Sequence, residues 1–327
     1  MAPRSPRSSG TRPPADPTRR HVLTGLGMLA AATGTGLLVG CGGAVGTDTA
    51  ASATAPASTM GSRRLGARFA DGYVASTALA AGPPQRAPYV LLGDDGWPMI
   101  DDAPDAVGLV LRAVGPNGAP GPDIASATVA RHGDGQATPY YPFRFQAPDP
   151  GDFVVEATVE GTTLPDVHHL RLADPADLAL VQLGDPLPAV ATPTIDDPRG
   201  VDPICTLATG PCRFHASSLV DAREQRGPTA LLISTPRFCQ QDVCGPTVGL
   251  LANALAARPA GENWRAVHAE VYMAPDAGDF TPTPVVGALG MAFEPSLVAA
   301  DADGKVTAAL HFTMDATEVA DALGSAI

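Results

Sequence analysis

A proline-rich segment divides the 327-residue chain into two parts with different sequence patterns. Between residues 174 and 201 lie Pro175, Pro186, Pro188, Pro193 and Pro198. Proline fixes φ and removes a backbone donor, so this much proline excludes a continuous helix or a central strand. We therefore expect residues 174–201 to be a linker between two domains, which the length of the chain also favours.

The part before this linker has the pattern of short β-strands. Apolar and β-branched runs alternate there with turn clusters such as Gly93-Asp94-Asp95-Gly96. The expected strands are 89–92, 107–114, 126–131, 140–145, 153–159 and 168–172. Short strands at this spacing are typical of antiparallel sandwiches. The segment 140–159 resembles a strand corner of immunoglobulin-like domains, so we expect residues 65–173 to form an all-β immunoglobulin-like sandwich.

The part after the linker alternates between strand and helix patterns. The expected strands are 228–234, 267–272, 296–300 and 306–312, and the expected helices are 243–257 and 316–327. A β-α-β unit followed by two further strands and a helix is the order of the thioredoxin fold. We therefore expect a multidomain chain, in which the sandwich is followed by an α/β domain.

The first 64 residues have the pattern of an export signal and a tether. The run from Val22 to Gly40 carries no charge, follows Arg19 and Arg20, and precedes Cys41. This resembles a twin-arginine signal with a lipobox, so we expect residues 1–41 to be a signal peptide and Cys41 to be lipidated. An uncleaved signal anchor is the alternative, which the lipobox disfavours. Residues 42–64 read as a flexible tether.

The chain is expected to be extracytoplasmic, with the lipid on Cys41 anchoring it to the outer face of the cell membrane. The formal net charge of −13 makes the chain a poor binder of a phosphate backbone, which excludes nucleic acid as a partner. The expected partners are the membrane, through the lipid, and thiols of envelope proteins.

Four cysteines remain when Cys41 is set aside, and an exported chain is permitted to form disulfides. The expected pairs are Cys205 with Cys212 and Cys239 with Cys244, although four cysteines allow three connectivities. We expect the first pair to be a structural clamp on a loop. The alternative is a second redox pair that exchanges with Cys239.

Cys239 is expected in the turn between a buried strand and a helix. The N–H groups and field at a helix start favour the thiolate, which is the form that attacks a disulfide. A plain disulfide that clamps the helix start explains the same placement, and the residues alone do not choose between these interpretations.

Several short motifs of residues 202–327 resemble the thioredoxin-like superfamily, in particular exported actinobacterial lipoproteins. They are the segment from Phe238-Cys239 to Cys244-Gly245-Pro246, the strand 268–272, and the segments 291–298 and 301–306. The resemblance implies a thioredoxin-like domain and a thiol–disulfide oxidoreductase. It also implies that Cys239 attacks and Cys244 resolves.

By the same resemblance, Phe238, Glu294 and Pro295 would contact a peptide substrate. The Glu294-Pro295 bond would be cis and would face Cys239. No cofactor and no metal ion is implied.

The chain departs from thioredoxins at three places. Four residues separate the cysteines instead of two, Phe238 replaces a tryptophan, and Ile233 stands where a buried acid is usual. Residues i and i+5 of a regular helix lie about 8–9 Å apart between Cα atoms, too far for a disulfide, which wants about 5.5–6 Å. The pair would therefore need an unwound first turn, or Cys239 outside the helix.

Three other functions remain as alternatives. The first is a non-catalytic binding module, built on a thioredoxin-like scaffold with structural disulfides. A peroxiredoxin-like peroxidase would use Cys239 and Cys244, but its threonine is displaced by one position, to Thr235. A copper site would need His268 or His311 beside the two thiolates.

Overall fold

The structure is a computed structural model that describes residues 63–327, except 70–77, 116, 135 and 240. The expected signal peptide, with Arg19, Arg20 and Cys41, lies outside the described residues, as does the expected tether up to residue 62. The described residues belong to one compact unit. Among them, no helix combines the length and the apolar character needed to cross a membrane.

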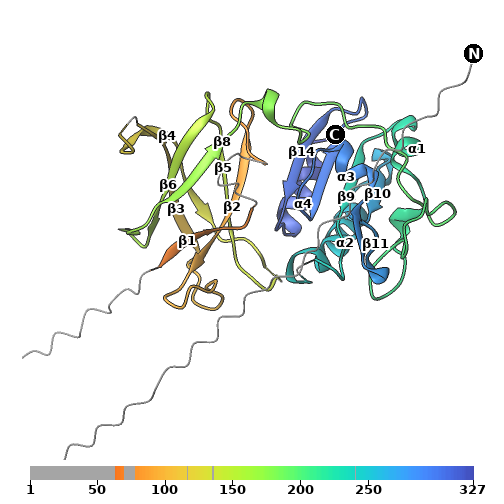
Figure 1. The fold of residues 1–327 in the computed structure, drawn as a ribbon, viewed down its shortest axis with the longest axis horizontal. Coiled ribbons are helices and arrows are strands. Elements are labelled where there is room, and N and C mark those ends of the chain that lie inside the picture. Colours follow the sequence, from red (N-terminus) through yellow and green to blue (C-terminus); the bar gives the residue numbers. More distant parts are fainter. Residues whose placement is uncertain (1–62, 70–77, 116, 135, 240) are drawn as a thin grey trace, which may run out of the picture. The chain divides into compact units, whose positions relative to one another are not determined.

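The first part of the described chain consists of antiparallel sheets (Figure 1). One sheet has the order β1-β2-β5, and the other has the order β4-β3-β6-β7, with β8 also paired to β6. The strands are β1 (Arg64–Ala67), β2 (Gln85–Leu92), β3 (Ala106–Val114), β4 (Pro120–Ala130), β5 (Tyr141–Phe145), β6 (Gly151–Val159), β7 (Thr162–Thr163) and β8 (His168–Leu172). All six expected strands are present, whereas β1 and β7 were not expected.

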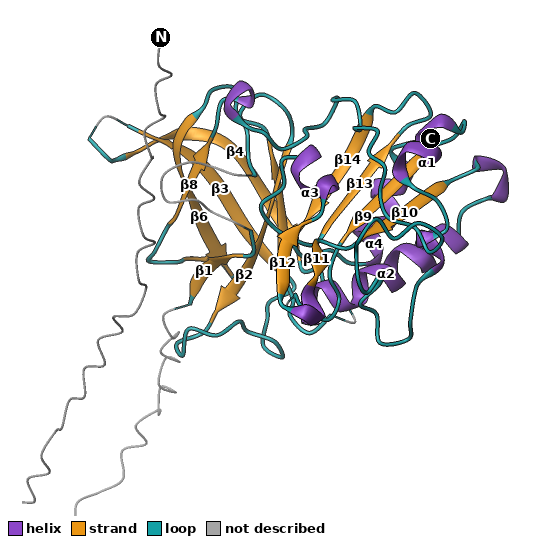
Figure 2. Cartoon of the chain, turned by 45° about the vertical axis from the view of Figure 1, so that its right-hand side comes forward, coloured by secondary structure: helices purple, strands orange, loops and turns teal. Residues whose placement is uncertain are grey.

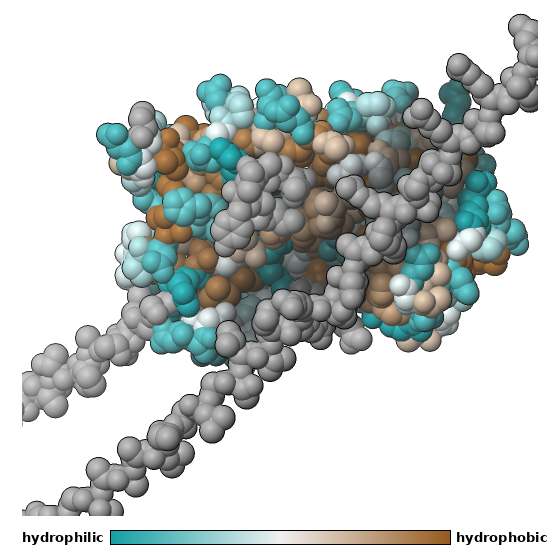
Figure 3. All heavy atoms as spheres, viewed as in Figure 1, coloured by the Kyte–Doolittle hydropathy of each residue, from teal (hydrophilic) through white to brown (hydrophobic). Residues whose placement is uncertain are grey.

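Side-chain alternation explains why these sheets share a core. On β6, Phe153, Val155, Ala157 and Val159 are buried, as their spacing of two residues predicts. They belong to the same cluster as Tyr89 of β2. On the face viewed in Figure 3, polar side chains gather along the rim and apolar ones are visible between them.

The second part contains a mixed sheet with the order β10-β9-β13-β14 (Figure 2). β9 and β10 are parallel, whereas β13 is antiparallel to β9 and to β14. The strands are β9 (Thr229–Ile233), β10 (Arg265–Ala269), β11 (Tyr272–Ala274), β12 (Asp279–Pro282), β13 (Ser296–Ala300) and β14 (Val306–His311). β9 and β13 are buried throughout, which fits their continuous apolar sequences.

Helices connect and flank this sheet. The α-helices are α1 (Leu219–Glu224), α2 (Gln241–Ala256), α3 (Pro284–Ala288) and α4 (Ala316–Gly324). The 3-10 turns are η1 (Pro175–Asp177), η2 (Arg213–His215), η3 (Ala260–Glu262) and η4 (Pro275–Ala277). The long helix α2 joins β9 to β10, and Asp315 caps α4 by accepting a hydrogen bond from the backbone N–H of Glu318. α1, α3 and the β11-β12 hairpin were not expected.

The expected linker is hydrogen bonded to the second part of the chain. Gly184 N donates to Val306 O, Leu187 N donates to Gly304 O, and Val306 N donates to Asp185 O. These bonds add a short irregular stretch to the edge at β14. Residues 182–187 are therefore fixed against the sheet rather than free to move as a tether.

A buried ionic network joins β2 to α4. The guanidinium of Arg86 donates to both carboxylate oxygens of Glu318 and to two backbone carbonyls, those of His311 and Thr313. Tyr140 and Arg144 donate to the same carboxylate at 2.7 and 2.8 Å. Arg86 and Glu318 are only 5% and 2% exposed, so this ion pair is shielded from water.

Candidate redox site

The turn between β9 and α2 places the first cysteine outside the helix. The N–H groups of Phe238 and Cys239 both donate to the carbonyl of Thr235, at 3.1 and 3.0 Å. α2 begins at Gln241, so Cys239 precedes it. The Cα atoms of Cys239 and Cys244 are then 6.0 Å apart, and the two residues form a disulfide. The expected pairing of these cysteines is confirmed, with Cys239 outside the helix as the geometry required.

The two sulfur-bearing residues differ in exposure. Cys244, in the first turns of α2, is fully buried, whereas Cys239 is half-buried. This agrees with the expectation that Cys244 is the more shielded of the two. An incoming molecule therefore meets Cys239 first.

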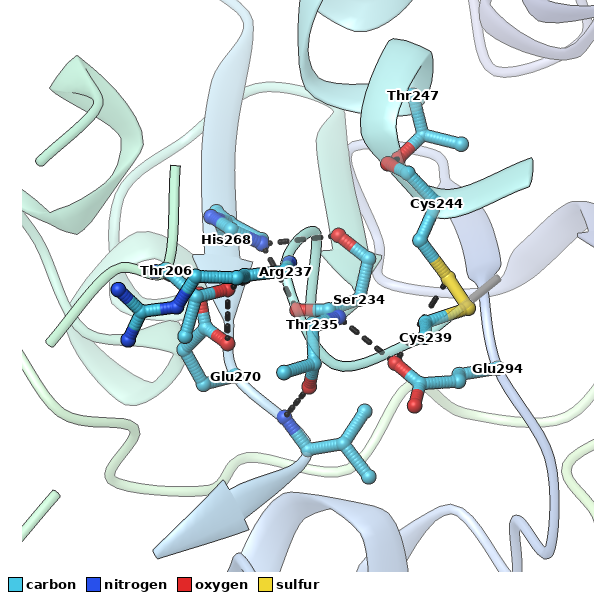
Figure 4. Close-up of a disulfide and its surroundings, with 11 residues drawn as sticks. Thr206, Ser234, Thr235, Arg237, Cys239, Cys244, Thr247, His268, Glu270 and Glu294 are labelled. Atoms are coloured by element: carbon cyan, nitrogen blue, oxygen red, sulfur yellow. Dashed lines mark hydrogen bonds between the residues drawn. A yellow bond between two sulfur atoms is a disulfide. The ribbon is translucent and has the colours of Figure 1, made fainter. Parts of the chain in front are cut away.

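A half-buried carboxylate, that of Glu294, lies beside the disulfide (Figure 4). Oε2 of Glu294 is 3.8 Å from Sγ of Cys244 and accepts a hydrogen bond from the backbone N–H of Thr235 at 2.7 Å. Burial raises the pKa of Glu294 above its usual range. Thioredoxins carry their buried acid at the position of Ile233, but here Glu294 supplies a carboxylate from another strand end.

Strand register explains this placement of Glu294. Ser296 of β13 is paired with Ile233 of β9, and the strands are antiparallel. Residue 294 therefore lies beyond the end of β9, where Thr235 begins the turn. The Glu294-Pro295 bond is cis, as predicted from the resemblance.

A row of aromatic side chains begins at Phe238, the residue before Cys239. The ring of Phe238 is 6.0 Å from that of Phe280, and Phe280 is 5.3 Å from Tyr272, between ring centroids. Phe280 is 51% exposed, on the short strand β12. The guanidinium of Arg237 lies 4.9 Å from the centre of the Phe238 ring. Phe238 is thus part of an aromatic surface, and the sequence did not indicate the contributions of Tyr272 and Phe280.

The other two cysteines are not bonded to each other, so the structural disulfide expected between Cys205 and Cys212 is wrong for this structure. Both sulfurs instead converge on Nδ1 of His268, at 3.9 Å from Cys205 and 3.5 Å from Cys212. Thr206 holds the loop beside β10, because its N–H donates to Oε1 of Glu270 at 2.7 Å. A hydrogen bond from Cys212 and the adjacent imidazoles lower the pKa of the Cys205 thiol, against the opposing effect of burial.

A second imidazole completes this cluster. His215 is 1% exposed, its ring centroid is 4.8 Å from that of His268, and neither of its ring nitrogens has a hydrogen-bond partner among the described residues. One donor atom from each of Cys205, Cys212, His215 and His268 lies within 4.8 Å of every other. The sequence signal for this cluster is the spacing Cys-x6-Cys-x2-His, which predicts nothing about His268.

The copper alternative needed a histidine beside Cys239 and Cys244, and the structure does not provide it. His268 lies with Cys205 and Cys212, and His311 makes a 2.9 Å hydrogen bond to Ser296. Among the described residues, the acidic or metal-ligating group close to both sulfurs of the disulfide is Glu294.

The peroxidase alternative needed a threonine hydroxyl beside Cys239. The hydroxyl of Thr235 accepts a hydrogen bond from the backbone N–H of Val271 and points away from the disulfide (Figure 4). The Thr235 hydroxyl is therefore not placed beside Cys239 as the peroxidase alternative required. Comparison of the sequence with protein-family models and with curated proteins gives no match.

Proposed function

We propose that the chain is a thiol–disulfide oxidoreductase whose residues 202–327 form a thioredoxin-like domain behind an immunoglobulin-like sandwich. The sheet order β10-β9-β13-β14, with one parallel pair and two antiparallel pairs, supports this fold. So does α2, which starts just after the first cysteine of the pair.

The single observation that carries the proposal is the asymmetry of the disulfide. Its half-buried sulfur, on Cys239, follows the central strand, and its fully buried sulfur, on Cys244, lies 3.8 Å from the Glu294 carboxylate. A purely structural disulfide needs no carboxylate beside it, and even partial burial of a carboxylate carries a desolvation cost. A proton acceptor at this place is what a resolving thiol requires.

The proposed reaction starts from the protein with Cys239 and Cys244 reduced. The thiolate of Cys239 attacks one sulfur of a substrate disulfide, forms a mixed disulfide and releases the first substrate thiolate. Glu294 then takes the proton of the Cys244 thiol, and the new thiolate attacks Sγ of Cys239. The Cys239–Cys244 disulfide forms, the second substrate thiolate leaves, and the substrate has gained two electrons. The same steps in reverse oxidise a dithiol.

The aromatic surface of Phe238, Tyr272 and Phe280 supports a protein or peptide substrate. The exposed ring of Phe280, packed against the ring of the residue before Cys239, offers apolar contact to the residues that flank a substrate cysteine. The export signal and lipobox of the sequence support an extracytoplasmic chain, anchored by lipid at Cys41, whose partners are thiols of envelope proteins.

Trapping of mixed disulfides tests the proposal. The Cys244→Ser variant, with Cys239 as its attacking thiol, should accumulate covalent adducts with substrate proteins that are released by dithiothreitol. The Cys239→Ser variant should accumulate none, and the Cys239→Ser/Cys244→Ser double variant serves as the matched blank. If neither single variant forms adducts although its thiol can be alkylated, the chain is a binding module and the proposal fails. Adducts on Cys239→Ser alone would reverse the two roles.

A further inference from the structure

Two thiols and two imidazoles converge in the interior, apart from the redox pair. Cys205 and Cys212 come from the loop that precedes α1, His215 ends the turn η2, and His268 lies on β10. Cys205, His215 and His268 are each at most 5% exposed. Two sulfur and two nitrogen donors from a loop and a strand are the ligand set of structural zinc sites.

The measured spacing fits tetrahedral coordination. With Zn–S bonds of about 2.3 Å and Zn–N bonds of about 2.0–2.1 Å, ligand sulfur and nitrogen atoms lie about 3.6 Å apart. Nδ1 of His268 is 3.5 Å from Sγ of Cys212 and 3.9 Å from Sγ of Cys205. These two pairs of donors are thus close to the separation that one shared ion sets, and all four donors lie within 4.8 Å of one another.

The hydrogen bonds of His268 leave the correct nitrogen free to bind. Its Nε2 is 3.0 Å from the hydroxyl oxygen of Ser234 and 3.2 Å from the carbonyl oxygen of the same residue, so in the tautomer with the hydrogen on Nε2 the ring donates to Ser234. In the neutral ring Nδ1 then presents a lone pair to the two sulfurs. A backbone carbonyl that holds the other ring nitrogen is the usual outer partner of a metal-binding histidine.

His215 supplies an independent observation. Its imidazole is almost fully buried, and both ring nitrogens lack a hydrogen-bond partner among the described residues. Leaving a buried polar group unpaired is costly, so native proteins rarely do it without a ligand. Coordination of an ion by one nitrogen removes part of this cost.

Charge balance favours the same ion. Two thiolates and two neutral imidazoles carry a charge of −2, which a divalent cation cancels, so the ion and its four ligands together carry no net charge. We propose that Cys205, Cys212, His215 and His268 bind one Zn²⁺ ion that ties the loop before α1 to β10. Four protein ligands leave no open position, so the ion is structural, and the site is separate from the chemistry proposed for Cys239 and Cys244.

Metal analysis of the full chain tests this site. We expect one zinc per chain after reduction, reconstitution with Zn²⁺ and removal of loosely bound metal. The Cys205→Ser/Cys212→Ser variant should hold none, whereas Cys239→Ser/Cys244→Ser, which also removes two thiols, should hold one. Reconstitution with Co²⁺ should give the visible absorption of tetrahedral thiolate coordination in the second variant and not in the first.

The His215→Leu variant separates metal binding from folding. It replaces an unpaired buried ring by an apolar side chain, so the metal-free protein should fold, as circular dichroism would verify. Its zinc affinity should fall more than about 100-fold, beyond the loss of about 10–100-fold that is typical of outer partners. Unchanged zinc affinity in this variant would overturn the proposal. So would a Cys205–Cys212 disulfide without zinc, or copper in place of zinc, in protein isolated from the cell envelope.

Discussion

The carboxylate of Glu294 lies 3.8 Å from the sulfur of Cys244, although 50 positions separate the two residues in the sequence. Thr235 fixes the carboxylate there through its backbone N–H. The contact places beside the buried cysteine a carboxylate that comes from a distant part of the sequence.

Replacement of Glu294 by glutamine should slow the second step of exchange. A positioned base contributes about 100-fold or more to a proton transfer, so the mixed disulfide of Glu294→Gln should resolve about 100-fold more slowly. Single-turnover measurement with a labelled peptide disulfide reads this step directly. Glu156→Gln, on β6, is the control and should resolve at the wild-type rate.

The pH dependence of the same step follows from the carboxylate. Burial raises the pKa of Glu294, and only the ionised form accepts a proton. The wild-type rate should therefore climb as the pH rises through this raised pKa and then level off. The Glu294→Gln variant should lack that inflection, and an identical profile in both proteins would remove Glu294 from the mechanism.

Truncation of Phe280 should weaken substrate capture without changing the disulfide. Loss of an aromatic contact at a binding surface costs about 1–2 kcal/mol, so Phe280→Ala should lower kcat/KM for a peptide disulfide about 5–30-fold. Trp97→Ala is the matched control, because Trp97 is also an exposed aromatic, at 74%, and lies in the turn after β2. Equal losses in both variants would argue against a binding role for Phe280.

Glu318→Gln should destabilise the fold by about 3–5 kcal/mol, because it leaves the Arg86 guanidinium buried without its counter-ion. Chemical denaturation at pH 7 measures the loss. Glu156→Gln breaks a more exposed pair with Arg112 and should change the free energy of unfolding by less than about 1 kcal/mol. A similar loss in both variants would contradict the importance of burial.

Acid should weaken the same network. Burial alone would raise the pKa of Glu318, but the charge of Arg86 and hydrogen bonds from Arg86 and Tyr140 outweigh it and lower the pKa. The stabilisation is therefore complete above the ordinary glutamate pKa of about 4.3 and is lost as the pH falls through the lowered value. The stability of Glu318→Gln should vary less with pH in that range than the stability of the wild type.

Cys41→Ser tests the expected lipid anchor, which lies outside the described residues. The wild-type chain should incorporate labelled fatty acid and sediment with membranes, and the variant should do neither. Unchanged processing and membrane association of Cys41→Ser would make the lipobox interpretation wrong.

The parts of the fold that the sequence predicted are those with strong local patterns. β13 was predicted to the residue, because an apolar run ends there at the turn Asp301-Ala302-Asp303-Gly304. α1 and α3 have six and five residues, which is too short for a helical periodicity to stand out. The linker was expected from its prolines, but its backbone bonds to β14 depend on contacts that no local pattern encodes.

The site was predicted only where its residues are close in sequence. Cys239 and Cys244 were found from their spacing, and the need for Cys239 to lie outside the helix followed from helix geometry. The proximity of Glu294 to Cys244 depends on strand register. From the sequence alone, His268 looks like a core residue within an apolar strand. Both contacts appear only when the sheet has formed.

The ion pair of Arg86 and Glu318 also sets an order of events during synthesis. Arg86, Tyr140 and Arg144 precede Glu318 by 232, 178 and 174 residues, so the ribosome makes all three long before their shared acceptor. Until α4 is complete, Arg86 lacks the Glu318 carboxylate that balances its charge. Burial of its guanidinium would then carry an uncompensated desolvation cost. A chain that stops before Ala316 would contain every strand of the described sheets and still lack the carboxylate that pairs with Arg86. Stable burial of Arg86 on β2 thus depends on the last helix of the chain.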